Sequence, residues 1–267
     1  MEKFAFILHP LSLQDMEHLS PLMRYIPDPI IEACLKMKKP FKVSHITGIK
    51  SPYAEAEGWF IGCPLTAKQM VELPEEFVMD RIIESGKVAQ ELGAKIVGLG
   101  AFTSIVGDAG ITVAKNLDIA VTSGNSYTVA TAIQGTKQAA RMMGKDLKEC
   151  RAVVVGATGS IGAASVRLLA KEVKHITLVA RHMGPLEELA QELIEQNHCE
   201  VAVSQDIRTS LQEADIVITV TSALDFLIEP GDLKPGAVVC DVARPRNVSR
   251  EVSLQRNDVL VLSLIHI

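Results

Sequence analysis

A run of apolar residues that ends in three regularly spaced glycines restricts the possible folds more than any other stretch of this sequence. Residues 152–162 read AVVVGATGSIG, in which Gly156, Gly159 and Gly162 have the spacing GxxGxxG. The apolar run predicts a buried β-strand, and the amphipathic residues 160–172 predict a helix that starts directly after the glycines. The sequence therefore predicts a strand, a tight turn and a helix in immediate succession.

This succession is typical of the phosphate-binding turn of a dinucleotide-binding domain. The first glycine would allow the tight turn, the second would admit the phosphates, and the third would let the helix approach the sheet. The backbone N–H groups and the positive end of the helix would then meet the pyrophosphate. We expect the contacts to come from Gly156, Thr158, Gly159, Ser160, Ile161 and Gly162. A purely structural junction without a ligand is the alternative.

The rest of the second half continues the alternation of strands and helices. Short apolar segments predict five strands, at 151–157, 175–181, 214–222, 236–243 and 258–263. Amphipathic segments at 160–172 and 185–196 predict helices between the first three strands. Because strands that alternate with helices form parallel sheets, we expect an α/β fold with a Rossmann-like, doubly wound parallel sheet.

The first half predicts a separate N-terminal α/β domain. Strands are expected at 4–9, 41–51 and 58–65, within 94–100 and within 118–126, and helices within 21–40 and at 74–93 and 128–144. The last of these helices marks the change between the two halves. We therefore expect an N-terminal domain at 1–124, a connecting helix at 125–145 and a nucleotide-binding domain at 146–267.

The end of the second strand of the nucleotide-binding domain selects between the two nicotinamide cofactors. Domains that bind NAD usually carry Asp or Glu there, about 20 residues beyond the glycines, to bind the ribose hydroxyls. This sequence has Arg181 and His182 instead. A guanidinium matches a 2′-phosphate in charge and geometry, which favours NADPH, and an exposed arginine without a ligand is the alternative. Thr221 and Ser222 follow a later strand and are expected near the nicotinamide.

Composition limits the class of the protein and its partners. The chain has 267 residues and a net charge of −5, so it lacks the basic footprint of a nucleic-acid-binding protein. Its five cysteines form no CxxC pair, which argues against a disulfide framework or a metal site and suits a reducing cytoplasm. No apolar run approaches the ~20 residues of a membrane span. We expect a cytoplasmic protein without a bound metal.

Three motifs resemble a known enzyme family. GLGAFTSIVGD at 98–108, TSGNSYTVA at 122–130 and VVVGATGSIGAA at 153–164 are similar, in order and spacing, to the long-chain acyl-[acyl carrier protein] reductases. The resemblance extends over about residues 4 to 262. It implies NADPH-dependent reduction of a fatty acyl thioester to an aldehyde through a cysteine thioester. It further implies that the N-terminal domain holds the acyl group, which acyl carrier protein or coenzyme A delivers.

The resemblance places the nucleophilic cysteine in a segment that follows the nucleotide-binding domain. This sequence ends in SLIHI soon after its last predicted strand, so we expect a chain truncated at its C-terminus, with the nucleophile outside it. Among the cysteines present, Cys240 is the first alternative, because it ends a predicted parallel strand where substrates meet cofactors. Cys63 is a further candidate, and for both cysteines the alternative is an ordinary core residue. Cys34, Cys150 and Cys199 are expected in helices or surface turns.

Other polar groups lie at the predicted domain junction and at strand ends. Gly124 and the polar residues Asn125, Ser126 and Tyr127 that follow it could orient the thioester carbonyl or the nicotinamide amide. The alternative is that Ser126 or one of its neighbours caps the next helix. His9 and His45 end or lie in predicted strands. We expect both to be core or rim histidines rather than general acids.

A cluster of lysines is the candidate docking site for an acidic carrier protein. It consists of Lys36, Lys38, Lys39 and Lys42. Opposite charges would attract such a partner to this stretch. The alternative is an ordinary solvated face.

Three other functions stay open. Residues 241–248, DVARPRNV, also resemble a segment of glutamyl-tRNA reductase, which likewise reduces an acyl group through a cysteine thioester. That family's Ser-Thr-Cys-Asn-Arg motif has no counterpart around Cys34 or Cys63. Shikimate dehydrogenase shares the two-domain plan, but its catalytic lysine and Asn-Thr-Asp motif have no match. The third alternative is a dinucleotide-binding protein without turnover.

Overall fold

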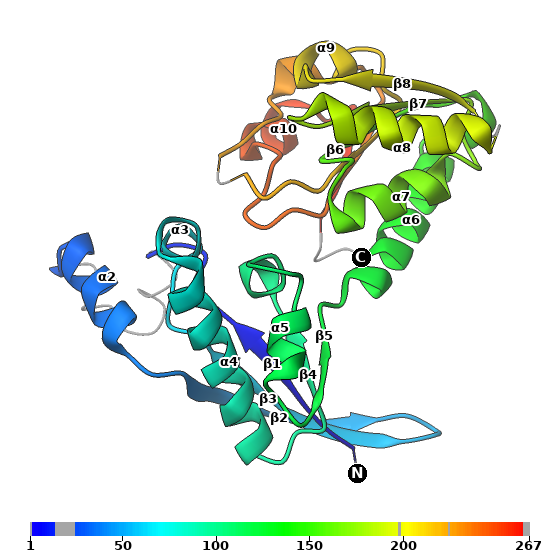
Figure 1. Ribbon diagram of the computed structural model, residues 1–267. Helices are drawn as coiled ribbons and strands as arrows, with labels where there is room; N and C mark the ends of the chain where they lie inside the picture. Colours follow the sequence, from blue (N-terminus) through cyan, green and yellow to red (C-terminus); the bar gives the residue numbers. More distant parts are fainter. Residues whose placement is uncertain (1, 14–24, 197–198, 224, 264–267) are drawn as a thin grey trace. The chain divides into compact units, whose positions relative to one another are not determined.

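A computed structural model describes residues 2–13, 25–196, 199–223 and 225–263. The chain forms two compact units, Met1–Gly124 and Asn125–Ile267 (Figure 1). Each unit contains a β-sheet with helices, so the predicted α/β class is confirmed. No described helix combines the length and the apolar character that a bilayer crossing demands.

The second unit is a doubly wound parallel sheet. Its strands are β6 (Arg151–Val155), β7 (His175–Val179), β8 (Glu200–Ser204), β9 (Ile216–Thr219), β10 (Val238–Asp241) and β11 (Leu260–Ser263). They are ordered β11-β10-β9-β6-β7-β8, and all neighbours are parallel. The chain thus starts near the centre at β6, winds out to β8 and returns to build the other half from β9. This order confirms the predicted Rossmann-like fold.

Helices cover both faces of this sheet. They are α6 (Asn125–Met142), α7 (Ser160–Leu169), α8 (Met183–Glu195), α9 (Ile207–Leu211) and α10 (Arg250–Gln255), with the 3-10 turns η3 (Leu147–Glu149) and η4 (Pro230–Asp232). In β6, Ala152 and Val154 belong to the apolar cluster of α6, α7 and α8, whereas Val153 and Val155 belong to that of α9 and α10. The strand reads as one continuous apolar run because both alternating sets of side chains are buried.

Two features of the second unit differ from the sequence-based picture. The segment expected as a connecting helix is α6, which packs on α7 and β10 inside this unit. The sequence predicted five strands, and the structure adds β8. This strand is five residues long, lies at the edge of the sheet and has no fully buried residue. An edge strand needs no continuous apolar run, so its sequence signal is weak.

The first unit has a mixed sheet. Its strands are β1 (Glu2–Leu8), β2 (Phe41–Lys50), β3 (Glu55–Gly62), β4 (Ile96–Leu99) and β5 (Ala120–Thr122), ordered β2-β3-β1-β4-β5. β2 runs antiparallel to β3, and the other pairs are parallel. The hairpin turn is closed by Ser51, whose Oγ accepts the N–H groups of Tyr53 and Ala54. The sequence predicted these strands but not the antiparallel direction of β2.

The core of the first unit lies on one face of its sheet. The helices are α2 (Asp28–Met37), α3 (Ala67–Glu72), α4 (Glu75–Glu91) and α5 (Ile111–Lys115), with the 3-10 turn η2 (Ala101–Ser104). Ile7 and Leu99 are almost fully buried in a cluster that includes residues of α3, α4 and α5. Side chains alternate between the faces of a strand, and on the opposite face Phe6, Leu8 and Ile96 stay partly exposed.

Asp215 joins three segments at the amino edge of the second sheet. Its carboxylate accepts hydrogen bonds from Nζ of Lys145 at 3.1 Å, Nζ of Lys234 at 2.8 Å and the N–H of Arg151 at 3.0 Å. Burial by itself would raise the pKa of Asp215, but the hydrogen bonds from Lys234, Arg151 and Lys145 outweigh it and hold the pKa below its usual value. The ionised carboxylate therefore links the starts of β6 and β9 to the approach to β10.

Replacing Asp215 with asparagine should lower the free energy of unfolding by about 1–3 kcal/mol near neutral pH, because charge-assisted hydrogen bonds are lost. The folded-state pKa is depressed, so this stabilisation is present above the unfolded-state pKa of about 3.9 and is lost as the pH falls through the folded-state pKa. Urea denaturation of both proteins at a series of pH values should show a stability difference that shrinks in acid. A difference that stays constant down to the lowest pH would contradict this assignment.

Candidate functional site

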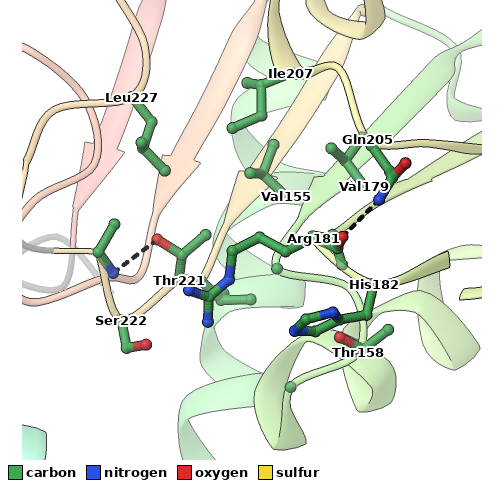
Figure 2. A pocket seen from close by; sticks show the side chains of 15 residues that line it. Val155, Thr158, Val179, Arg181, His182, Gln205, Ile207, Thr221, Ser222 and Leu227 are labelled. Atoms are coloured by element: carbon green, nitrogen blue, oxygen red, sulfur yellow. Dashed lines mark hydrogen bonds between the residues drawn. The ribbon is translucent and has the colours of Figure 1, made fainter. Parts of the chain in front are cut away.

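A cleft of about 330 Å³ opens at the carboxyl ends of the central strands of the second unit. It is lined by the glycine loop after β6, by residues 179–182 at the end of β7, by Gln205 and Ile207 after β8, and by residues 220–223 after β9 (Figure 2). The order of strands reverses between β6 and β9. Ligands of doubly wound sheets bind at this reversal, so the cleft is the candidate functional site.

Two glycines of the loop are required by backbone geometry. Gly156 has a φ of +86°, in the left-handed region that favours glycine, and a Cβ there would lie 2.9 Å from the carbonyl oxygen of Val220. A Cβ on Gly162 would lie 2.1 Å from the carbonyl oxygen of Gly156, so α7 and the loop approach to a distance that only glycine permits. A Cβ on Gly159 would meet nothing nearer than 3.4 Å. Its missing side chain leaves the approach to α7 open.

The start of α7 presents backbone donors. Gly159 is the N-cap residue and supplies no side-chain cap. Within the described residues, the N–H groups of Ser160 and Ile161 have no acceptor, and the helix dipole adds a partial positive charge. Nδ2 of Asn125 donates to Oγ of Ser160 at 3.0 Å, which brings the first residue of α6 beside this helix start. This arrangement can hold an anion such as a phosphate.

Arg181 and His182 extend into the cleft from the end of β7 (Figure 2). Both are exposed, and in the described part of the chain no carboxylate forms an ion pair with the Arg181 guanidinium. Nε2 of Gln205 donates to the carbonyl oxygen of Arg181 at 2.6 Å, which fixes the backbone from which the guanidinium extends. A cationic group held at the rim in this way suits an anionic part of a ligand.

The cleft brings together most of the residues that the sequence predicted for the cofactor. Those that line it are Gly156, Thr158, Gly159, Arg181, Thr221 and Ser222. The others, Ser160, Ile161 and Gly162, form the first turn of α7.

Sequence reasoning missed the polar residue Gln205, which lines the cleft, and Asn247, which contacts residues at the end of β9 and in the lining. Gln205 follows β8, the strand that was not predicted. Asn247 follows β10, and its side chain reaches Thr219 and Thr221. A signal was present for Asn247, because polar residues that follow a buried parallel strand lie at the ligand-binding edge of the sheet.

The structure places both candidate nucleophilic cysteines in the cores. Cys240 lies within β10 with no exposed surface, and Cys63 is equally buried in the first unit. Burial raises the pKa of the Cys240 thiol, and it raises the pKa of Cys63 to about 12. Neither position favours a reactive thiolate. Cys150 was expected in a surface turn or helix, and this was wrong, because it is buried after η3.

Alkylation of the native protein with iodoacetamide should modify Cys34, which is exposed on α2, at least about tenfold faster than Cys63 or Cys240. Both burial and a raised pKa reduce the thiolate that reacts. Peptide mass spectrometry at a series of times measures the three rates, and the same reaction in urea is the control in which they should converge. Fast labelling of Cys240 in the native protein would restore it as a candidate nucleophile.

The two histidines have structural partners. The ring of His9 donates from Nδ1 to the carbonyl oxygen of Pro10 at 3.0 Å, and its Nε2 accepts the N–H of Phe102 at 3.1 Å. This tautomer is neutral and connects β1 to η2. His45 stacks on Trp59, with ring centroids 5.4 Å apart, and its Nε2 lies 3.2 Å from Oε2 of Glu57.

The remaining candidates lie before α6, in its first turn and in the first unit. Gly124, with a φ of +72°, precedes α6, and Ser126 is exposed in its first turn. The described contacts bring only Asn125 of this group to the glycine loop. The predicted docking lysines are Lys36, Lys38, Lys39 and Lys42, which are all exposed and form no ion pair with a described carboxylate. Lys38 lies over the ring of Phe41, 3.9 Å from its centroid.

Comparison with known proteins gives matches to a dehydrogenase family, an aminotransferase and two kinds of reductase. Residues 137–263 match the family described as shikimate / quinate 5-dehydrogenase. The aminotransferase PigE of Serratia sp. (strain ATCC 39006) is 31% identical over 223 residues, which cover 83% of this chain and 25% of PigE. The long-chain acyl-[acyl-carrier-protein] reductase of Synechococcus elongatus is 26% identical over 269 residues, 93% of this chain and 74% of that protein. The glutamyl-tRNA reductase of Chlorobium chlorochromatii is 29% identical over 119 residues, 42% of this chain and 27% of that protein.

These matches agree with the architecture of the second unit. The chain spans only about a quarter of PigE and of the glutamyl-tRNA reductase, and about three quarters of the acyl reductase. The family match coincides with the six-stranded sheet and its cleft. The second unit is therefore a domain of the NAD(P)-dependent oxidoreductase type.

Proposed function

We propose that this protein is an NADPH-dependent reductase that converts a long-chain fatty acyl thioester into a fatty aldehyde. The observation that supports this function best is the cleft of the second unit. There the glycine loop and Arg181 line one space beside the open start of α7. Such a space suits a coenzyme with a pyrophosphate and a further phosphate.

The residues of the cleft fit NADPH. The N–H groups of Ser160 and Ile161 would hold the pyrophosphate, and Gly159 leaves room for it. Arg181 would bind the 2′-phosphate, and none of the described residues that line the cleft is Asp or Glu, the usual partners of the free ribose hydroxyls in NAD sites. When bound, the nicotinamide supplies a hydride. The residues of this chain would bind the coenzyme and orient its nicotinamide.

The similarity to the Synechococcus acyl reductase supports the substrate class. The proposed reaction consumes one thioester, one NADPH and one proton, and it yields one aldehyde, one free thiol and NADP⁺. We assign the acyl chain to the first unit and its delivery to acyl carrier protein or coenzyme A. The exposed lysines Lys36, Lys38, Lys39 and Lys42 are the surface that suits an acidic carrier.

The proposed reaction passes through a cysteine thioester, as the family resemblance implies. The burial of Cys63 and Cys240 supports neither of them as the nucleophile. The proposal therefore leaves this role to a cysteine other than these two.

Two measurements test the function. Fluorescence titration should show tighter binding of NADPH than of NADH. Incubation of the protein with NADPH and a long-chain acyl thioester of carrier protein or coenzyme A should then release an aldehyde, detected by mass spectrometry. Glutamyl-tRNA and shikimate, the latter with NADP⁺, are the rival substrates. NADPH binding without turnover of any substrate would support a non-catalytic protein, and failure to bind NADPH would overturn the proposal.

A further inference from the structure

We infer that Asn247 is a positioning residue for the nicotinamide side of the cofactor cleft. It acts through the rim, defined here as residues 220–223 after β9. The inference rests on the proposed function, because it assigns a role toward the same cofactor. The side chain of Asn247 does not itself line the cleft, so it would act by holding the residues that do.

The side-chain oxygen of Asn247 receives three hydrogen bonds. Oδ1 accepts from Oγ1 of Thr219 at 2.8 Å, from the N–H of Thr221 at 3.2 Å and from Oγ1 of Thr221 at 2.9 Å. A backbone N–H can only donate, so the atom that faces Thr221 has to be the oxygen of the amide. Oγ1 of Thr221 in turn accepts the N–H of Ala223 at 3.2 Å. One oxygen atom thus fixes the end of β9 and the first half of the rim.

Asn247 is itself held in place by its backbone. It is fully buried, and its N–H donates to Oδ2 of Asp241, at the end of β10, at 3.1 Å. Its carbonyl oxygen accepts the N–H groups of Leu227 at 2.8 Å and of Ile228 at 3.1 Å. These three backbone hydrogen bonds restrict the movement of Asn247. It therefore provides a rigid support for the rim.

The rim and the glycine loop form one rigid wall of the cleft. The N–H of Val220 donates to the carbonyl oxygen of Val155 at 2.9 Å, and the absent Cβ of Gly156 would lie 2.9 Å from the carbonyl oxygen of Val220. The rim follows β9, on one side of β6, whereas Arg181 follows β7, on the other side. A displaced rim should therefore disturb the nicotinamide half of the coenzyme and leave the adenosine half in place.

The side-chain nitrogen of Asn247 allows a direct test of this positioning role. Nδ2 of Asn247 is buried and has no hydrogen-bond partner among the described residues. The side chain makes its three described hydrogen bonds through the oxygen alone. Aspartate at this position keeps an oxygen that can accept them, whereas alanine removes all three. Asn247→Asp should therefore retain the NADPH affinity that Asn247→Ala loses.

The experiment compares Asn247→Ala and Asn247→Asp with Asp215→Asn as the matched control. Asp215 is a partly buried polar side chain at the opposite edge of the same sheet. Without cofactor, hydrogen–deuterium exchange should increase in the rim only in Asn247→Ala. In titrations, Asn247→Ala should weaken NADPH binding about tenfold while adenosine 2′,5′-bisphosphate, which lacks the nicotinamide, binds within about twofold of wild type. Asn247→Asp should bind NADPH within about threefold of wild type.

The outcomes separate this inference from the proposed function. Wild-type protein that binds neither NADPH nor the bisphosphate would overturn both. Normal NADPH binding by Asn247→Ala, or equal weakening of NADPH and bisphosphate, would overturn only the role of Asn247. A rim that exchanges no faster in Asn247→Ala than in wild type would also overturn it. A comparable loss in Asp215→Asn would show a general effect of instability, which contradicts positioning.

Discussion

Alanine at position 162 should abolish NADPH binding and lower the melting temperature by about 6–12 °C, the equivalent of about 3 kcal/mol in a domain of this size. The new Cβ would lie 2.1 Å from the carbonyl oxygen of Gly156 and 2.9 Å from its carbonyl carbon. Both partners are backbone, so no side chain can move aside. Either α7 shifts away from β6 or the loop moves, and both changes separate the helix start from the phosphates.

Two other glycines provide graded controls for this prediction. Gly159→Ala has no contact closer than 3.4 Å, so it should weaken NADPH binding at the helix start with little loss of stability. Gly184→Ala, at the start of α8, meets nothing within 4 Å and should leave binding unchanged. Circular dichroism and fluorescence titration of all three variants supply the data. A Gly162→Ala protein that binds NADPH like wild type would show that the loop does not hold the coenzyme.

Replacing Arg181 with glutamine should weaken NADPH binding about 10- to 100-fold and leave NADH binding nearly unchanged. Charge-assisted hydrogen bonds to a phosphate contribute about 1.5–3 kcal/mol, and NADH lacks that phosphate. The backbone of Arg181 stays held by Gln205, so the substitution removes the guanidinium without moving β7. Dissociation constants for both coenzymes, measured at two salt concentrations, test the effect and its electrostatic origin.

Arg208→Gln is the matched control for Arg181. Arg208 lies on α9, outside the cleft lining, and its side chain is exposed beside Asp232. This variant changes the net charge by the same amount and should leave NADPH binding unchanged. Arg181→Lys keeps the charge but loses the planar pair of donors, so its affinity should lie between wild type and Arg181→Gln. Equal losses for NADPH and NADH in Arg181→Gln would argue against recognition of the 2′-phosphate.

The parts of the fold that the sequence predicted are those with strong local signals. β6 is covered on both faces, so its four buried side chains, Ala152 to Val155, are all apolar and the strand is easy to recognise. Backbone geometry permits only glycine at positions 156 and 162, and these two glycines predicted the turn and the start of the helix. The regular spacing between the glycines and the end of the second strand of the domain placed Arg181 at the end of β7.

The parts that were missed depend on contacts between distant segments. β8 is a half-buried edge strand, so its five residues carry a weak pattern, and Gln205 was missed with it. Asn247 is hydrogen-bonded to Thr221 and Thr219, 26 and 28 positions away in the sequence, and the polar residue after β10 does not by itself reveal these partners. The burial of Cys150 likewise follows from how α6 and the strands pack together.

The carboxylate of Asp215 has a consequence for how this protein can change over evolution. It secures the amino ends of the strands, and the coenzyme cleft lies at their carboxyl ends, about 16 Å away for a strand of five residues. Mutations that alter coenzyme choice therefore fall far from the bonds that maintain the architecture. A lineage could exchange one nicotinamide coenzyme for the other through surface changes such as those at position 181, without passing through unstable intermediates.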